Sequence, residues 1–262
     1  MADAQTLPHQ IAQAFVAARR AGHALPDFPG AIPSSLEAAY AVQDAALALT
    51  GGQVGGWKVG RINPPVDGVD RLSGPIFVDQ IVEATDETLA MPIFGDGFGA
   101  AEAEFLLRIG TAPDPAKSDF TIDEARALID AVHVGIEIAS SPFPGINSHG
   151  PTATVSDFGN NNGLVVGAEA QGWQDADLNG WPVTLAINGE EIGAATTATM
   201  LDGPFGAARY LLSHMAARGI ALKAGQWIST GAVTGVHQVK PGDVVTCTFD
   251  GRLTVACTIK AR

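Results

Sequence analysis

The chain contains an apolar, strand-like run that carries two acids, Ala101-Glu102-Ala103-Glu104-Phe105-Leu106-Leu107-Arg108-Ile109. Because side chains alternate along a strand, Glu102 and Glu104 point to the same face with Cα atoms about 7 Å apart, so both carboxylates can reach one ion. A third acid, Glu137, interrupts a second apolar run at Val134-Gly135-Ile136-Glu137-Ile138-Ala139. Three carboxylates without thiols suit Mg²⁺, Mn²⁺ or Ca²⁺ and leave coordination positions for water and a chelating substrate. The pattern indicates a divalent-cation site.

The spacing alone leaves a second interpretation open. Glu102 and Glu104 also fit the solvated face of an edge strand, paired with Arg108 or a lysine. The six histidines form no HxxxH or HExxH pattern, and His133, at the same strand parity as Glu137, is expected to be an ordinary core or surface residue. The sequence also lacks GxGxxG opening a helix, GxxxxGK[ST] and GxSxG, so dinucleotide-binding, P-loop and serine-hydrolase functions are not indicated.

The composition favours a small-molecule partner. The 262 residues are 46% hydrophobic and 16% charged, which is enough apolar material for a substantial core. A formal net charge of −13 with 15 Lys and Arg in total argues against nucleic-acid binding. There is no apolar run of membrane-spanning length and no signal-peptide pattern at Met1–Gln5, so we expect a cytoplasmic protein without a membrane partner.

The predicted type of secondary structure changes at about residue 53. The first part predicts two helices, and the remainder predicts strands interrupted by two more helices, which together indicate a single α+β catalytic domain over residues 1–262 with an N-terminal helical portion at 1–52 and a strand-rich body at 53–262. The expected helices are residues 11–20 ending at Gly22, a helix from the capping box Ser34-Ser35-Leu36-Glu37 to Gly51, one from the capping box at Thr121–Glu124 to about Val132, and one from Pro204 to Arg218.

Turns are expected at Asn63-Pro64-Pro65, Gly95-Asp96-Gly97, Asn188-Gly189 and Asp250-Gly251. A two-residue hairpin at Asp250-Gly251 would pair Phe249 with Arg252 and Cys247 with Thr254. Side-chain alternation then places Cys257 on the opposite face from Cys247. We therefore expect both cysteines to be reduced.

A lone lysine lies in an apolar, glycine-rich stretch, Trp57-Lys58-Val59-Gly60. Partial burial would lower its pKa and fit Lys58 for proton transfer or for holding a substrate carboxylate, although a surface lysine with a buried stem fits the same pattern. Asp79, isolated in Gly74-Pro75-Ile76-Phe77-Val78-Asp79-Gln80, is expected either to relay a proton near a lysine or to cap a turn.

Two loops offer hydrogen-bonding groups. The first, Asp157 to Gly163, reads as a polar, flexible loop whose Asn160 and Asn161 are candidates for binding a carboxylate or an enolate oxygen. The second, Ser229 to Gly235, offers the hydroxyl of Thr230 and a close backbone approach at Gly231. Both loops equally fit plain turn chemistry.

Six segments of the chain form an ordered set of motifs: Gly56-Trp57-Lys58-Val59-Gly60, Gly74-Pro75-Ile76-Phe77 with Asp79, Glu102-Ala103-Glu104, Gly135-Ile136-Glu137-Ile138, Asn162 to Gly167 and Leu222 to Gly231. Taken together, they resemble the 2-keto-4-pentenoate hydratase and 4-oxalocrotonate decarboxylase family, which belongs to the fumarylacetoacetate hydrolase-like superfamily. The resemblance implies a mixed β-roll fold, Mg²⁺ or Mn²⁺ held by Glu102, Glu104 and Glu137, and Lys58 and Asp79 as polar active-site residues. It places the loops around residues 160 and 230 beside the substrate.

By the same resemblance the chain is expected to be a homo-oligomeric lyase of aromatic catabolism that acts on a 2-keto or 2-hydroxy-dienoic acid, with the cation stabilising an enolate. Hydration is the first expectation and decarboxylation of a 4-oxalocrotonate-type acid the second. An acylpyruvate hydrolase is a weaker alternative, because hydrolases of the superfamily typically place an aspartate where this chain has Glu137. A non-catalytic ligand-binding member is the last, because the loop Phe158-Gly159-Asn160-Asn161 departs from the usual family string.

Overall fold

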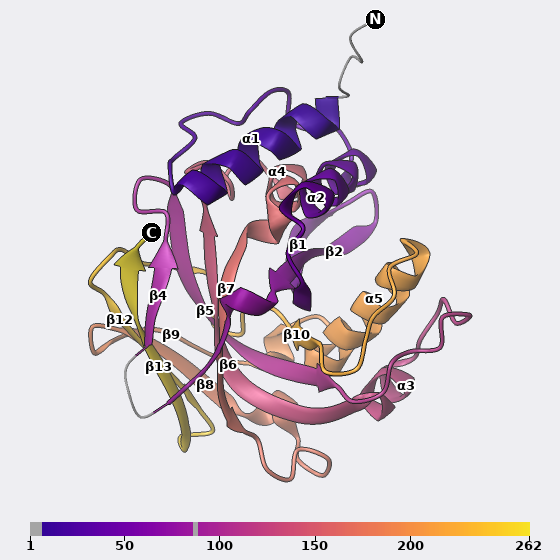
Figure 1. Cartoon of the computed structure of the whole chain (residues 1–262). Coiled ribbons are helices and arrows are strands. Elements are labelled where there is room, and N and C mark those ends of the chain that lie inside the picture. Colours follow the sequence, from indigo (N-terminus) through magenta and orange to yellow (C-terminus); the bar gives the residue numbers. More distant parts are fainter. Residues whose placement is uncertain (1–6, 86–88) are drawn as a thin grey trace, which may run out of the picture.

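The computed structural model describes residues 7–85 and 89–262, and so leaves the N-terminal stretch Met1–Gln5 outside the description (Figure 1). Two helices come first, α1 (Leu7–Ala21) and α2 (Leu36–Thr50). The Oγ of Ser35 accepts from the N–H of Ala38 and begins α2, and Gly51 ends it in a left-handed conformation. The capping box predicted at Ser34 is therefore wrong by one residue. The cap is Ser35, and the residue three positions after it is Ala38, which has no carboxylate to complete a capping box.

An eight-stranded mixed sheet forms the first layer. Its strand order is β2-β1-β10-β5-β6-β7-β3, with β11 pairing with β5. The long antiparallel pair β5·β6 lies inside this sheet, flanked by β10 and β7. The bounds are β1 (Val54–Val66), β2 (Val69–Phe77), β3 (Ile81–Glu83), β5 (Phe98–Ile109), β6 (Ile129–Ser141), β7 (Asn161–Glu169), β10 (Trp227–Ser229) and β11 (His237–Gln238).

A five-stranded mixed sheet, in the order β4-β13-β12-β8-β9, forms the second layer. Apolar side chains from both sheets meet in the main core, where the ring of Phe105 packs edge-on against Phe249 with centroids 5.2 Å apart. The bounds are β4 (Leu89–Ile93), β8 (Pro182–Ile187), β9 (Glu190–Thr196), β12 (Val244–Phe249) and β13 (Leu253–Ala261). The two mixed sheets with their helices confirm the predicted α+β class.

One further long helix and several short ones complete the fold. The predicted helix near 204–218 is α5 (Gly203–Ala217), which buries Ala207, Leu211 and Met215 and half-buries Tyr210. The other elements are α3 (Ile122–Ala127), α4 (Pro151–Ser156), which was not predicted, and the single turns η1 (Val78–Gln80), η2 (Phe158–Asn160), η3 (Leu178–Gly180) and η4 (Thr197–Thr199). Among the described residues, no helix is long and apolar enough to cross a bilayer.

Tertiary pairing overrides two local predictions. The capping box of α3 forms at Thr121, but the helix ends at Ala127 because the apolar run from Ile129 pairs with β5. The turn expected at Asn63-Pro64-Pro65 lies within β1 instead, and the chain reverses at Asp67-Gly68, where both residues have positive φ. Long-range strand pairing thus decides where these elements end.

The last hairpin has a three-residue loop, Asp250-Gly251-Arg252, since Phe249 pairs with Leu253 and Cys247 with Val255. The predicted two-residue register is therefore wrong. Cys257 lies two residues beyond the partner of Cys247, so both thiols point to the same face rather than to opposite faces. Both cysteines are nevertheless free and buried, as expected.

Candidate functional site

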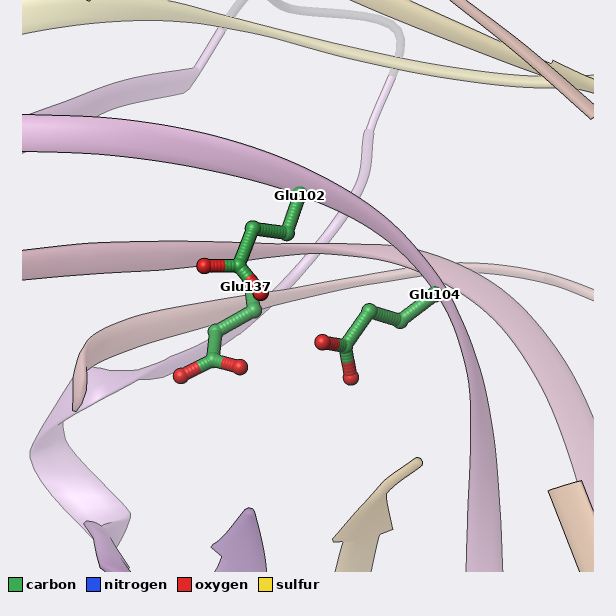
Figure 2. A group of neighbouring side chains, drawn as sticks. All are labelled: Glu102, Glu104 and Glu137. Carbon is green, nitrogen blue, oxygen red and sulfur yellow. The ribbon is translucent and has the colours of Figure 1, made fainter. Parts of the chain in front are cut away.

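Strand register brings the three predicted acids together. Glu102 pairs with Glu137 across β5 and β6, and alternation along β5 places Glu104 on the same face (Figure 2). One carboxylate oxygen from each residue lies within 4.8 Å of the others. Glu104 and Glu137 are fully buried and Glu102 is 5% exposed. The solvated edge-strand alternative is wrong, because β5 lies between β10 and β6.

Protein donors hold one oxygen of each fully buried carboxylate. Oε1 of Glu137 accepts from Nδ2 of Asn161 at 2.9 Å and lies 3.1 Å from Nζ of Lys58. Oε2 of Glu104 accepts from Oγ of Ser229 and from the N–H of Gly231 at 3.0 Å. These donors fix the rotamers of the two acids.

The second oxygen of each of these two acids is different. Oε1 of Glu104 and Oε2 of Glu137 are buried and have no hydrogen-bond partner in the described part of the chain. Burial of an oxygen without a hydrogen-bond partner costs about 1 to 3 kcal/mol of folding free energy, and more when the group is charged. Two unpartnered carboxylate oxygens beside a third acid are the donor set that a hard divalent cation takes. The residues present therefore fit such an ion.

The negative charges of the three carboxylates exceed the positive charge that the protein places beside them. Burial raises the pKa of Glu102 to about 7, against the opposing charge of Lys58. Burial, together with Glu137 and Glu102, raises the pKa of Glu104 well above its usual range. One ammonium group faces three carboxylates, so an added divalent cation would relieve the remaining repulsion.

Lys58 behaves differently from the sequence prediction. Burial by itself would lower its pKa, but the charges of Glu137, Glu102 and Glu104 outweigh burial and raise the pKa above the ordinary value. The predicted lowering is therefore wrong for the cation-free site. The cause is three acids that lie at least 44 positions away in the sequence and so were not counted as its neighbours.

A cavity of about 980 Å³ lies beside the carboxylates, and both Lys58 and Glu102 line it. β1 pairs with β10 only at Gly56–Lys58, and the cavity follows the next part of β1, residues 58–64. Residues 230–236 line another part of the wall. Asn147, Arg71 and Met200 also contribute, and sequence reasoning identified none of these three. The site therefore has a charged region at the acids and a mixed polar and apolar remainder.

The predicted substrate residues divide into two groups. Asn160, Thr230 and Gly231 line the cavity. Asn160 is 2% exposed and its Oδ1 has no partner among the described residues, whereas the hydroxyl of Thr230 already donates to the carbonyl of Phe105 at 2.8 Å. Asn161 does not line the cavity and instead donates to Glu137. The Oδ1 of Asn161 also lacks a partner among the described residues, so what sets Asn160 apart is that its free acceptor belongs to a residue of the cavity lining.

Two further candidates lie apart from the acids. Asp79 is exposed on η1 and is not among the residues that line the cavity. His133 forms a hydrogen bond with the carbonyl of Gly167 at 2.8 Å and packs edge-on against Trp227, which confirms the ordinary role expected for it.

The segment before Asn161 is buried rather than a flexible loop. Phe158, Gly159 and Asn160 have left-handed φ values of 55°, 66° and 65°. The carbonyl of Phe158 lies against Gly74, where a Cβ would come within 2.1 Å of the oxygen. Only glycine at position 74 lets this backbone approach the sheet so closely.

Comparison with known proteins places the chain in a family. A model of the fumarylacetoacetate (FAA) hydrolase C-terminal family matches residues 82–260, which include all three acids. The chain belongs to this family. The family match does not include Lys58 or the two N-terminal helices.

One relative matches most of the chain and another matches half of it. The 2-keto-4-pentenoate hydratase of Paraburkholderia xenovorans (strain LB400) is 27% identical over 250 residues, which is 92% of this chain and 91% of that protein. A 4-oxalocrotonate decarboxylase of Pseudomonas putida is 27% identical over 130 residues, which is 50% of this chain and 49% of that protein.

Solved structures of the family share the fold. The 4-oxalocrotonate decarboxylase from Pseudomonas putida G7, complexed with magnesium and adipate, superposes with a TM-score of 0.78 at 22% identity, over 96% of this chain and 97% of that one. The fumarylpyruvate hydrolase from Pseudomonas aeruginosa, in complex with Mn²⁺ and pyruvate, superposes with a TM-score of 0.59 at 15% identity, over 79% of this chain and 89% of that one. These likenesses confirm the predicted fold type.

Proposed function

We propose that this protein is a divalent-metal-dependent lyase that adds water to a 2-hydroxy-2,4-dienoate. The observation that carries the proposal is the pair of buried acids, Glu104 and Glu137, each with one oxygen held by protein donors and the other unpartnered, next to Glu102, which lines the cavity. The hydratase relative matches 92% of the chain, which favours hydration over the chemistry of relatives that match half of it.

The three acids have one role in this proposal. Glu102, Glu104 and Glu137 would hold Mg²⁺ or Mn²⁺, since two of them have unpartnered buried oxygens and Glu102 lines the cavity. When bound, the cation supplies positive charge to the carboxylate and 2-oxygen of the substrate and so favours the enolate form.

Lys58 and Asn160 have the second role, the handling of protons and water. Hydration begins with ketonisation, in which C5 of the dienol gains a proton and the 2-hydroxyl loses one, leaving a 3,4-alkene conjugated to the 2-ketone. Water then adds at C4, and C3 takes up the proton that balances the addition. Nζ of Lys58 lies at the acids and in the cavity wall, where it holds or moves these protons, and Oδ1 of Asn160 is free to accept from the incoming water.

Asp79 receives no part in the proposal, because it is exposed and lies outside the cavity lining. The homo-oligomeric state remains a prediction from the family resemblance, and the cytoplasmic location remains a prediction from the sequence pattern. Light scattering of the purified protein measures the first.

A 4-oxalocrotonate-type decarboxylase is the second candidate. It is favoured by the superposition on the decarboxylase from Pseudomonas putida G7, which covers 96% of this chain. The same electron-accepting site would receive the electron pair left by departing CO₂, so the acids and Lys58 keep their roles.

One experiment separates the two. Metal-stripped protein is incubated with 2-hydroxypenta-2,4-dienoate and, separately, with 4-oxalocrotonate, and Mg²⁺ or Mn²⁺ is added back while ultraviolet absorbance and CO₂ are followed. Metal-dependent loss of the dienoate without CO₂ supports the hydratase, and CO₂ from 4-oxalocrotonate supports the decarboxylase. No reaction with either acid contradicts the proposal.

A further inference from the structure

An arginine on the first helix reaches the interior of the molecule. Arg19 of α1 is 7% exposed and Asp157 is 1% exposed, and the two form a bidentate ion pair with Nε–Oδ1 at 2.5 Å and Nη2–Oδ2 at 2.9 Å. The guanidinium also donates to the carbonyl of Ser140 at 3.0 Å and to Oδ1 of Asn162 at 3.3 Å. Ser141 donates its hydroxyl to the same carboxylate at 2.6 Å. Asp157 is therefore held by side chains from two elements, α1 and β6.

Asp157 is the first residue of the segment that supplies the site. The next three residues are left-handed, and the last of them, Asn160, lines the cavity with its free Oδ1. Asn161 follows and donates to the metal-site acid Glu137. An unbroken path of buried contacts thus runs from helix α1 through Asp157 to the carboxylate cluster.

The left-handed conformation needs support from outside the segment. Non-glycine residues such as Phe158 and Asn160 adopt it at a cost, so it persists only where surrounding contacts impose it. The guanidinium of Arg19 supplies such contacts twice, by pairing with Asp157 and by lying 5.4 Å from the ring centroid of Phe158. On the far side the segment is tied down by the hydrogen bond from Asn161 to Glu137.

We propose that Arg19 is a positioning residue for the metal site, which acts through Asp157 to fix Asn161 against Glu137 and to present Asn160 to the cavity. The inference rests on the metal site of the proposed function. It also assigns a task to α1, which lies before the part of the chain that the family model matches. The first helix belongs to the binding machinery through this one side chain.

Mn²⁺ affinity, measured by calorimetry at a temperature where circular dichroism shows every variant folded, tests the coupling. We expect Arg19→Met to weaken Mn²⁺ binding at least tenfold and Arg19→Lys, which keeps the charge, to restore part of the loss. Arg20→Met is the matched control, because the neighbouring Arg20 donates to the exposed carbonyl of Leu49, and it should bind Mn²⁺ within twofold of the parent.

A double-variant cycle separates positioning from general stability. Asn161→Ala should weaken Mn²⁺ binding by itself, and adding Arg19→Met to it should cause no further loss, because the path to Glu137 is already cut. Equal Mn²⁺ affinity of the parent and Arg19→Met, or full additivity with Asn161→Ala, would overturn the inference.

Two other outcomes remain informative. If Arg19→Met fails to fold, Asp157→Asn, which keeps the shape and removes the charge, takes its place with the same expected loss and the same refuting result. Absence of Mn²⁺ binding by the parent protein would refute the metal site itself and the coupling with it, whereas parent binding that Arg19→Met leaves unchanged refutes the coupling alone.

Discussion

Replacement of Glu102 by glutamine should stabilise the metal-free protein while it destroys the cation site. Glu102 is buried beside two other acids, and its pKa is raised from an ordinary 4.5 to about 7. A carboxyl group with a raised pKa binds its proton more tightly in the folded state, so folding stability falls as pH rises from 4.5 to 7. Glutamine carries no charge and escapes this loss.

The size of this loss of folding stability in the parent follows from the change in the pKa of Glu102. About 2.5 pKa units correspond to about 3 kcal/mol once both pKa values have been passed, at pH 8, and to about 1 kcal/mol at pH 5. Coulomb repulsion gives an independent figure, since two unit charges within 4.8 Å of each other at an effective dielectric constant of about 20 repel by about 3 kcal/mol or more. For a chain of this length, 3 kcal/mol is about 6 to 12 °C in Tm.

Thermal unfolding by calorimetry, with EDTA and then with excess Mg²⁺ or Mn²⁺, is the assay. In EDTA at pH 8 we expect Glu102→Gln to melt above the parent, with the gap shrinking at pH 5. Added cation should raise the Tm of the parent, by an amount equivalent to about 3 kcal/mol at a hundred times its Kd, and leave the variant unchanged. The exposed Glu190 provides the control, because Glu190→Gln should change stability by no more than about 0.5 kcal/mol. A variant that melts below the parent in EDTA at pH 8, or that gains as much as the parent from the cation, refutes the reasoning.

Two further predictions concern Lys58 and His214. Lys58→Met should lower kcat by about 10²- to 10⁴-fold. Its Mn²⁺ affinity should stay within a few-fold of the parent's, because Lys58 is not a ligand. Normal turnover in a steady-state assay would show that Lys58 takes no part in the chemistry. His214 packs between Tyr40 and Tyr210, and burial, aided by Arg218, lowers its pKa to about 4. The unfolded histidine titrates near 6.5, so the parent loses stability as pH falls from about 6.5 towards 4, and His214→Phe should avoid about 2 kcal/mol of that loss at pH 4.5. Urea unfolding at pH 7.5 and 4.5 measures the difference, and parallel pH dependence in both proteins would contradict it.

Local sequence patterns predicted the parts of the site that depend on strand geometry. Alternation along one strand placed Glu102 and Glu104 on one face, and an acid in a second apolar run pointed to Glu137. The start of α3 was likewise local, because the capping box at Thr121 needs only four residues. These features are encoded over a few positions and survive in the fold.

Features that depend on distant partners were not predictable in this way. The charge state of Lys58 is set by acids on other strands, and the buried conformation of Phe158 to Asn160 depends on Arg19, 138 positions before Asp157. In the last hairpin, an error of one residue in the predicted loop length reverses the predicted orientation of a cysteine. The loop includes Arg252 as a third residue, so Cys257 lies on the same face as Cys247. Asp79 lay within a matching family string, yet the structure leaves it exposed outside the cavity.

The left-handed backbone from Phe158 to Asn160 has a consequence for engineering. Each non-glycine residue held in this conformation costs the folded protein on the order of 1 kcal/mol. Selection of a mutant library for heat resistance alone would reward changes that let this segment relax, and those same changes would withdraw Asn160 from the cavity and Asn161 from Glu137. Directed evolution of this protein should therefore alternate selection for survival on heating with selection for turnover.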